Sequence, residues 1–567
     1  MPHDLVISGG VVVDGTGASP RSADVAIDDG VISDVGVVTG PARRRIDADG
    51  ATVMPGFVDI HTHYDGQATW ADLLVPSSWH GVTTVVMGNC GVGFAPVRPH
   101  DRDRLIELME GVEDIPGAAL HEGLTWEWET FPEYLDALER RPHDIDLAAQ
   151  VPHAAVRLYV MGERGAARED ATAEEIVEMG RIAREAIAAG ALGFTTSRTK
   201  NHRSSRGEYT PTLTAAAEEL IGIAEALGAG VLEVVSDFAH VEEELRTVIG
   251  MTETSGRPLS ISVAQADGRP DGWRRLLDAI TEANDHGFDV SAQVAARPVG
   301  IILGLQTTVH PLGGSRTAKS LSSLPLPEQV AQLHRSEVRS AVLAELAEAR
   351  TVYTYERLFP MTDPPDYEPP ADASVAAAAA RAGVSPAEML YDLVLADDGH
   401  AMLYVPFLNY SGGNLDAARE MLAHPHSVLG LGDGGAHVGT ICDASFPTTM
   451  LTHWVRDRRR GPLLDLPMVV ANQTSRTARA VGLLDRGVVA PGMRADLNVV
   501  DLDGLRLRVP TIAHDLPAGG KRFLQRADGY LHTIVAGVPV YADGEHTGAL
   551  PGRLVRGAQP EPTTSLS

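Results

Sequence analysis

Two histidines separated by one residue are the clearest chemical signal in the chain. His61 and His63 follow a short apolar run, residues 57–60, which begins after a Pro-Gly pair. Side chains on a strand repeat every second residue, so both imidazoles leave the same face at the C-terminal end of the strand. Two neutral imidazoles on a stiff element can bind one cation together. The spacing therefore predicts a metal centre; the alternative for an isolated His-x-His is a surface pair without a ligand role.

Two further side chains could complete such a centre. Asp433 lies in the glycine-rich run 429–437, after another apolar run, and its carboxylate could bind the metal and take a proton from water. Its alternative role is to cap a loop. Cys90 follows the apolar run 83–88, and this placement favours a metal ligand over a small buried core residue. Cys442 has no such placement, and we expect it to be structural.

Strands that alternate with helices would position these residues. A helix is predicted at 173–189, because Thr172 and Glu175 have the spacing of a capping box, and another at about 214–227. Eight short strands with helical material between them are typical of a (β/α)8 TIM-like barrel, an α/β fold that collects catalytic residues at its strand ends. The predicted strands are 57–60, 83–88, 145–151, 191–196, 231–235, 259–264, 289–294 and 427–431.

Short strands also occur near both ends of the chain. Residues 4–50 contain no helix-length pattern, and strands return at 495–500, 530–536 and 538–541. The simplest arrangement packs these two pieces as one small, split β-sandwich domain. The predicted divisions are residues 1–53 with 487–557 for that domain, 54–486 for the metal-dependent barrel, an insertion at about 300–385 and a loose tail at 558–567. We expect the insertion, with a helix near 336–349, to be a lid or an assembly element.

Composition excludes several classes of partner. The 567-residue chain has a net charge of -29, which disfavours nucleic acid and anionic membranes. No apolar stretch is long enough to cross a bilayer. The two cysteines cannot form a disulfide framework, and the first residues lack the pattern of a secretory signal. We therefore expect a cytoplasmic protein with a small-molecule substrate, and a homo-oligomer.

Four motifs give the chain a family resemblance. It resembles the amidohydrolase superfamily, and most of all the N-acyl-D-amino-acid deacylases (D-aminoacylases). The resemblance implies a zinc-dependent barrel with a flanking β-sandwich, which hydrolyses the amide of an N-acylated amino acid. The matching motifs are Pro55-Gly-Phe-Val-Asp-Ile-His-Thr-His63, Gly88-Asn-Cys-Gly-Val-Gly-Phe-Ala-Pro96, Gly190-Ala-Leu-Gly-Phe194 and Ala490-Pro-Gly-Met-Arg-Ala-Asp-Leu-Asn-Val499.

The resemblance also implies roles for single residues. His61, His63 and Cys90 would bind one or two zinc ions, and Asp433 would be both ligand and general base. Family members place a histidine ligand at the end of the fifth strand and another at the end of the sixth, but residues 231–237 and 259–265 contain none. Glu233 or Gln265 could substitute, or one metal could be held by His61, His63 and Asp433. Glu233 could equally be a buried structural residue.

Substrate contacts are predicted in the loop after the fourth strand. Arg198, Lys200, Arg206 and Tyr209 lie there, and arginine can hold a carboxylate through two hydrogen bonds. The alternative is a solvated basic loop that pairs with local acids. His153 and His437 are candidate donors to the oxyanion, although His153 could merely anchor a loop.

The leading hypothesis is a zinc hydrolase that cleaves a linear amide, most of all that of an N-acyl-D-amino acid. A second hypothesis keeps the site but changes the substrate to a cyclic amide, a urethane or a xenobiotic amide. A third, motivated by the missing histidines, is a catalytically inactive barrel that serves as an assembly scaffold.

Overall fold

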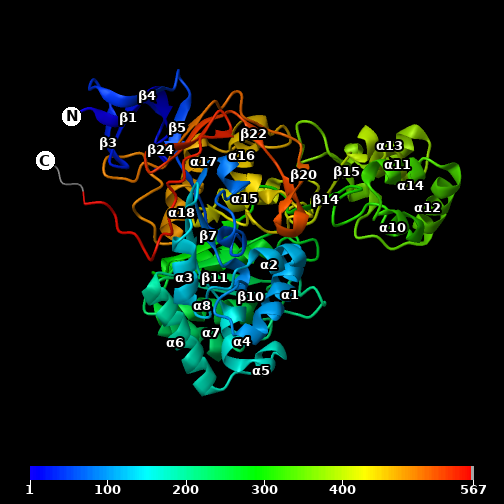
Figure 1. The fold of residues 1–567 in the computed structure, drawn as a ribbon, viewed down its shortest axis with the longest axis horizontal. Coiled ribbons are helices and arrows are strands. Elements are labelled where there is room, and N and C mark those ends of the chain that lie inside the picture. Colours follow the sequence, from blue (N-terminus) through cyan, green and yellow to red (C-terminus); the bar gives the residue numbers. More distant parts are fainter. Residues whose placement is uncertain (564–567) are drawn as a thin grey trace.

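The computed structural model describes residues 1–563 and has a mixed α/β fold. Figure 1 shows a central body of strands and helices, a sheet beside the N-terminus, and a helical lobe on the opposite side. Of the predicted loose tail, residues 564–567 lie outside the described residues.

Parallel strands occupy the centre of the molecule, at the positions that the sequence predicts. They form one sheet in the order β6-β7-β8 and a second in the order β17-β13-β12-β11-β10-β9. Most of their residues are buried, as parallel strands covered on both faces require. Their bounds are β6 Phe57–Asp59, β7 Val82–Met87, β8 Asp146–Ala149, β9 Val151–Pro152, β10 Gly193–Arg198, β11 Val231–Ser236, β12 Leu259–Ser262, β13 Val290–Val294 and β17 Ser427–Leu429.

The two parallel sheets are connected at both ends. Strand β8 passes into β9 across Gln150. On the other side, Thr62 bridges Gly434 in parallel, the His63 amide donates to the Gly434 carbonyl (2.7 Å), and the Asp433 amide donates to the His61 carbonyl (3.0 Å). The segments that follow the first and last central strands therefore lie side by side, although they are far apart in sequence.

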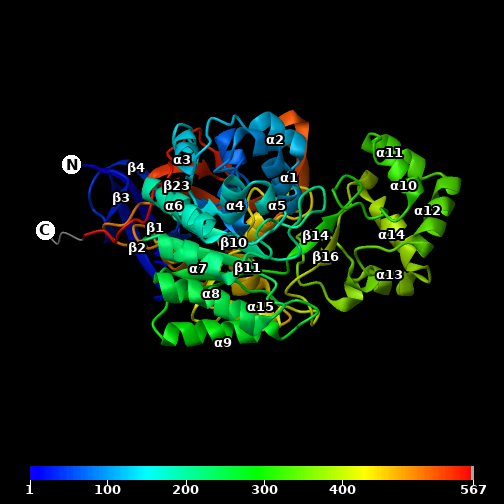
Figure 2. The same ribbon diagram turned by 90° about the horizontal axis from the view of Figure 1, so that it is seen from below.

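Helices cover the outside of these strands. Figure 2 shows α6, α7, α8 and α9 side by side. Helix α6 begins with the predicted capping box of Thr172 and Glu175 and is followed by Gly190. No helix within residues 1–563 is both long and apolar enough to cross a membrane. The helices are α1 Arg102–Glu113, α2 Gly117–Gly123, α3 Phe131–Glu139, α4 His153–Met161, α5 Glu163–Ala166, α6 Ala173–Ala189, α7 Ala217–Ala226, α8 Val241–Ser255, α9 Gly272–Asp285, α15 Asp416–Leu422, α16 Phe446–Thr449, α17 Leu466–Asn472 and α18 Ser475–Ala480.

Both ends of the chain contribute to one sheet, in the order β25-β24-β23-β18-β5-β1-β2-β3, with β4 paired to β1. The two parts of the sheet meet where β18, from the C-terminal part of the chain, pairs antiparallel with β5, from the N-terminal part, with Leu497 opposite Pro55. Asp28-Asp29-Gly30 turns the chain between β2 and β3, and Asp-Gly is a common hairpin turn sequence. The strands are β1 His3–Val12, β2 Arg21–Asp28, β3 Val31–Gly36, β4 Ala42–Asp47, β5 Thr52–Pro55, β18 Leu497–Val500, β23 Tyr530–Val535, β24 Val538–Ala542 and β25 Glu545–His546.

The helical lobe has a hydrophobic core of its own. It leaves the central body through β14 and returns through β16, with Ile302 opposite Tyr404 in antiparallel register. The return strand ends at Pro406, later than the boundary near 385 expected from the sequence. Figures 1 and 2 show the lobe projecting to one side. Its elements are β14 Gly300–Leu303, α10 Arg316–Leu321, α11 Leu326–Leu333, α12 Ser336–Glu348, β15 Phe359–Pro360, α13 Val375–Ala382, α14 Pro386–Val394 and β16 Leu403–Pro406.

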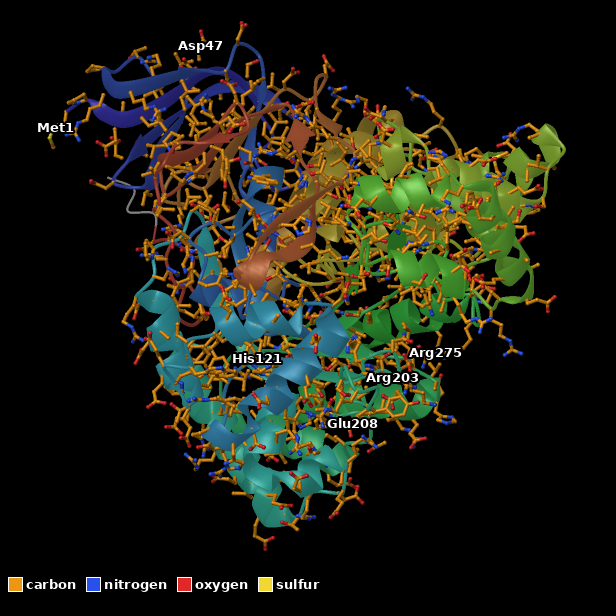
Figure 3. All side chains as sticks on the ribbon, turned by 45° about the vertical axis from the view of Figure 1, so that its right-hand side comes forward. Met1, Asp47, His121, Arg203, Glu208 and Arg275 are labelled. Atoms are coloured by element: carbon orange, nitrogen blue, oxygen red, sulfur yellow. The ribbon has the colours of Figure 1, made fainter. Side chains whose placement is uncertain are left out.

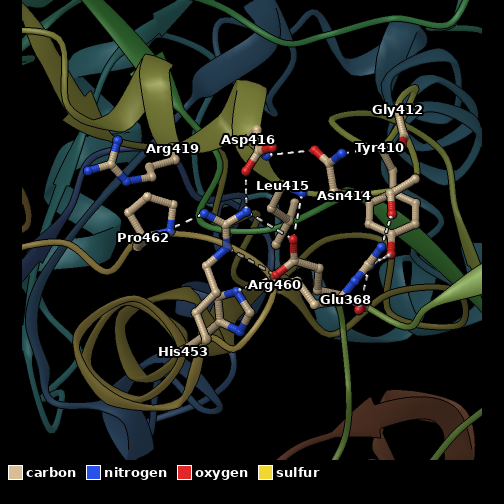
Figure 4. Close-up of polar contacts among 12 residues, drawn as sticks. Glu368, Tyr410, Gly412, Asn414, Leu415, Asp416, Arg419, His453, Arg460 and Pro462 are labelled. Atoms are coloured by element: carbon tan, nitrogen blue, oxygen red, sulfur yellow. Dashed lines mark hydrogen bonds and ion pairs between the residues drawn. The ribbon is translucent and has the colours of Figure 1, made fainter.

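A buried ion-pair network fastens the segment around Glu368 to the central body (Figure 4). The Arg458 guanidinium, whose side chain is fully buried, donates to both carboxylate oxygens of Glu368 (3.1 and 3.0 Å). The Leu415 amide donates to the same carboxylate (2.8 Å), and His453 Nε2 lies 3.2 Å from it. Burial alone would raise the pKa of Glu368, but His453 and Arg458 hold it at about 2.

Replacing Glu368 with Gln should therefore lower the free energy of unfolding by about 1.5–3 kcal/mol at neutral pH, because buried Arg458 would lose one of its two acidic partners and keep only Asp416 (2.6 Å). The folded pKa lies below the unfolded value of about 4.3, so this stabilisation is complete above pH ~4.3 and is lost as the pH falls toward 2. Urea unfolding curves of both proteins across this range would measure the difference. The exposed pair of Glu127 and Arg140 supplies a control, since Glu127→Gln should cost less than about 1 kcal/mol.

Candidate active site

His61 and His63 lie at the carboxyl end of β6 with their side chains almost completely buried. His61 Nε2 lies 3.3 Å from Cys90 Sγ and 3.5 Å from Asp433 Oδ1, and His63 Nε2 lies 3.7 Å from the same Asp433 oxygen. His61, His63 and Cys90 each contribute one potential ligand atom, and these three atoms all lie within 4.8 Å of one another. The structure therefore brings together the four side chains on which the predicted metal centre depends.

A tight turn after β7 aims Cys90 at this point. Cys90 has a left-handed backbone (φ 55°), between Asn89 and Gly91. The Asn89 amide side chain donates to the carbonyls of Thr62 (3.1 Å) and Val86 (2.9 Å), and so ties the turn to the histidine strand. A Cβ at Gly91 would lie 2.9 Å from the backbone of Thr196, so only glycine allows this close approach.

Asp433 reaches the site from the loop after β17. Its backbone is left-handed (φ 46°), a conformation that aspartate and asparagine tolerate. A Cβ at Gly432 would lie 2.8 Å from Asp59, and one at Gly435 would lie 2.9 Å from the His63 carbonyl. The neighbouring glycines therefore let this loop pass against the first strand, which places the Asp433 carboxylate between the two imidazoles.

The electrostatics of the site suit a metal centre. Burial lowers the pKa of His61 to about 4 and also lowers that of His63, although Asp433 opposes both shifts. Both imidazoles are therefore neutral near pH 7 and offer lone pairs. Burial would raise the pKa of Asp433, but the surrounding histidines hold it well below its usual range, so this carboxylate is ionised.

Buried polar atoms without hydrogen bonds test whether a cation fits. Among the described residues, both ring nitrogens of His63 and both carboxylate oxygens of Glu233 lack a hydrogen-bond partner. Burial and the nearby carboxylates, chiefly Glu113 and then Glu233, raise the pKa of the Cys90 thiol well above its usual value. A divalent cation would take up one nitrogen of His63 and could take up the Glu233 carboxylate, and it would hold the Cys90 sulfur as thiolate. Imidazole, thiolate and carboxylate are the ligands of zinc, so the residues present fit a zinc ion.

Comparison with known proteins agrees with this geometry. A model described as the amidohydrolase family matches residues 44–541. The chain belongs to the amidohydrolase family. It is 28% identical to a D-aminoacylase of Alcaligenes xylosoxydans xylosoxydans, over 98% of each chain. A solved D-aminoacylase structure has a TM-score of 0.65 at 27% identity and covers 98% of this chain and 100% of that one. An N-acyl-D-glutamate deacylase of Bordetella bronchiseptica, solved with zinc and a phosphonate inhibitor, has a TM-score of 0.62 at 26% identity, with 98% and 100% covered.

This amidohydrolase differs from the expected pattern at the ends of its fifth and sixth strands. Glu233 lies on β11, buried, with one carboxylate oxygen 4.0 Å from His61 Nδ1, and burial raises its pKa to about 8. Gln265, after β12, is already engaged: its side chain donates to the Pro270 carbonyl (3.1 Å) and accepts from the Ser411 amide (3.1 Å). Of the two predicted substitutes, only Glu233 lies at the site with unpartnered atoms.

The oxyanion role predicted for His153 does not fit its geometry. His153 is completely buried, and both ring nitrogens are engaged, Nδ1 with Thr196 Oγ1 (2.9 Å) and Nε2 with Glu219 Oε1 (2.9 Å). Arg157 donates to the same Glu219 oxygen (2.8 Å). His153 therefore has no nitrogen left for a substrate and anchors α4 to β10 and α7. His437 keeps 29% of its side chain exposed and remains available.

The predicted carboxylate-binding loop does not converge on the site either. The Arg198 guanidinium donates to Glu244 on α8, Arg206 pairs with Glu107, and Tyr209 accepts a hydrogen bond from Arg203 (2.6 Å). Arg203 lies at the outer surface of the molecule (Figure 3). Lys200 is exposed, and within residues 1–563 only its backbone amide forms a hydrogen bond, to Asp237 (2.9 Å). These contacts favour the alternative reading of a solvated loop paired with local acids.

Sequence reasoning missed three residues near the metal group. Gln293 Oε1 lies 2.7 Å from His61 Nδ1, and Glu113 Oε1 lies 3.4 Å from His63 Nδ1. His202, in the basic loop, has its pKa lowered to about 3, by burial and then by the charges of His437 and His63. Gln293 could have been found, because it is a polar residue near the end of a predicted strand. Glu113 gave no signal, because it ends helix α1 in the long connection between two strands.

Proposed function

We propose that this protein is a zinc-dependent hydrolase of linear amide bonds that deacylates N-acyl-D-amino acids. The observation that carries the proposal is the convergence of His61 Nε2, His63 Nε2, Cys90 Sγ and Asp433 Oδ1 on one buried point. The named relatives, which align over nearly the whole chain, supply the substrate class. Glu233 is a further candidate ligand, so the site would hold one or two zinc ions.

The same proposal includes the architecture. The connected parallel strands support a (β/α)8 barrel at residues 54–486, and the shared sheet supports a split β-sandwich domain built from 1–53 and 487–557. We further propose a cytoplasmic homo-oligomer. Its two cysteines are both unpaired, which suits a reducing compartment.

The chain's own residues would divide the chemistry as follows. When bound, zinc supplies Lewis acidity to the amide carbonyl and to the attacking water. Asp433, ionised and placed between the imidazoles, takes the proton from that water and then gives it to the leaving amine nitrogen. His437, partly exposed and close to Glu113 (3.6 Å), is the remaining candidate for contact with the acyl oxygen.

A chelation and substrate experiment tests this function. Removing metal with a chelator should abolish hydrolysis of N-acetyl-D-amino acids, and added zinc should restore it, whereas the L-enantiomers should react poorly. The panel should include D-aspartate and D-glutamate derivatives, because relatives carry those names. If zinc-loaded protein hydrolyses none of the panel, the proposed function fails.

The unusual fifth strand favours one alternative. Since the fifth strand carries Glu233 and no histidine, the same site could instead accept a cyclic amide, a urethane or a xenobiotic amide. Activity on those substrates without activity on acyl amino acids would select this alternative. An inactive scaffold is disfavoured, because it would bury the Glu233 carboxylate and His63 without partners.

A further inference from the structure

We propose that Glu113 and Gln293 are positioning residues that fix the tautomers of the two histidines, so that both present Nε2 to the metal. The inference rests on the proposed function, since it assigns the arrangement of that metal site. It concerns the far side of each imidazole, which the family motifs of the sequence do not include.

On the His61 side, the partner is a neutral amide. Gln293 Oε1 lies 2.7 Å from His61 Nδ1, and Gln293 Nε2 donates to Ser260 Oγ (2.8 Å). All three residues are buried. In this orientation of the Gln293 amide, its nitrogen donates to Ser260 and its carbonyl oxygen faces the imidazole, where it can only accept. His61 must then carry its proton on Nδ1, which leaves the Nε2 lone pair facing Cys90 and Asp433.

On the His63 side, the partner is a carboxylate. Glu113 Oε1 lies 3.4 Å from His63 Nδ1, and its other oxygen lies 3.6 Å from His437 Nε2. The Glu113 side chain is only 1% exposed, so water does not compete for these contacts. Burial and the neighbouring carboxylates raise the pKa of Glu113 well above its usual value. A bound cation would favour the ionised form, and that carboxylate would accept from Nδ1–H and leave Nε2 free. That Nε2 faces Asp433 at 3.7 Å.

Backbone contacts hold Glu113 at this place. Helix α1 ends there, because Asp114 adopts a left-handed conformation (φ 49°). The Glu113 carbonyl accepts from the His437 amide, and the Asp114 carboxylate accepts from the Gly439 amide (3.2 Å). The loop that carries Asp433 and His437 is therefore fastened to the end of α1, and the carboxylate of Glu113 has little freedom to leave His63.

Two roles for Glu113 can be separated by experiment. If it orients His63, then removing its acceptor oxygens weakens zinc binding. If it only holds the loop, its backbone does that work, and the side chain matters for stability alone. The same reasoning applies to Gln293, whose side chain contacts His61 and Ser260 rather than a loop.

The test measures zinc affinity by competition with a chromophoric chelator, without any substrate. Glu113→Met and Gln293→Met, which remove the acceptors, should each weaken zinc binding by about 10–100-fold. Glu113→Gln, which keeps an acceptor oxygen, should retain most of the affinity. Matched controls are Glu110→Met, one turn earlier on α1, and Gln265→Met, at the end of the neighbouring strand; both should bind zinc like the parent protein.

A second measurement needs no variant that could misfold. In cobalt-substituted parent protein, proton NMR should show slowly exchanging, paramagnetically shifted N–H signals from both histidines, because each Nδ1–H would be buried and would face an acceptor oxygen, at 2.7 Å for His61 and 3.4 Å for His63. Glu113→Gln should keep both signals. The inference is overturned if the parent lacks them, or if folded Glu113→Met and Gln293→Met bind zinc as tightly as the controls. Failure of the parent protein to bind zinc would instead overturn the proposed function, so the two failures are distinguishable.

Discussion

Asp433→Asn should lower kcat by about 10²–10⁴-fold while the protein still binds zinc. The reason is that Asp433 is the ionised acceptor in the site, held between His61 and His63 at 3.5 and 3.7 Å, and asparagine cannot take a proton from water. Asparagine has the same shape and tolerates the left-handed backbone at this position, so the change removes basicity without adding backbone strain. Steady-state kinetics with zinc content measured on the same sample would check it.

A matched control lies in the helical lobe. Asp398 also has a left-handed backbone (φ 50°) and is exposed, so Asp398→Asn repeats the chemical change away from the site. It should leave kcat unchanged. Near-normal turnover by zinc-loaded Asp433→Asn would remove Asp433 from the role of base and leave it, at most, as a ligand.

Cys90→Ser should weaken zinc binding by at least about 10-fold and lower activity in step. A serine hydroxyl stays protonated near neutral pH, whereas a metal-bound thiol is deprotonated, so the variant loses an anionic ligand. Cobalt substitution gives a direct readout, because only a thiolate ligand produces a sulfur-to-cobalt charge-transfer band in the near ultraviolet. That band should be present in the parent protein and absent from Cys90→Ser.

The second cysteine provides the control for this experiment. Cys442 is buried, and burial raises the pKa of its thiol above the usual range, but it lies outside the metal group. Cys442→Ser should keep the charge-transfer band and the zinc affinity. Equal zinc affinity in Cys90→Ser and the parent protein would exclude Cys90 from the ligand set.

Short sequence patterns were enough to predict the site residues that lie directly after central strands. The period of two in a strand placed His61 and His63 on one face, and strand ends pointed to Cys90 and Asp433. The same reasoning also gave the positions of the central strands and the start of α6, because a capping box is local in sequence.

Partner choice between distant segments was not predictable in this way. His153 occupies a strand end, as the catalytic pattern requires, but Glu219 and Thr196 engage both of its nitrogens. Arg198 was expected to bind a substrate carboxylate, yet its guanidinium already donates to the carboxylate of Glu244, on a neighbouring helix of the same chain. Glu113 reaches the site from a helix end, where no periodic signal exists. Each case depends on which acid the folded chain brings close, and single-sequence spacing carries no information about that.

The shared sheet of the two chain ends has a consequence for synthesis on the ribosome. Strand β5 pairs on one side with β18, which is made roughly 440 residues later. At about 5–20 residues per second, the β5 edge stays open for tens of seconds or more after it emerges. An open strand edge is a template for pairing with other chains. The nascent protein is therefore exposed to aggregation at this strand until translation is nearly complete.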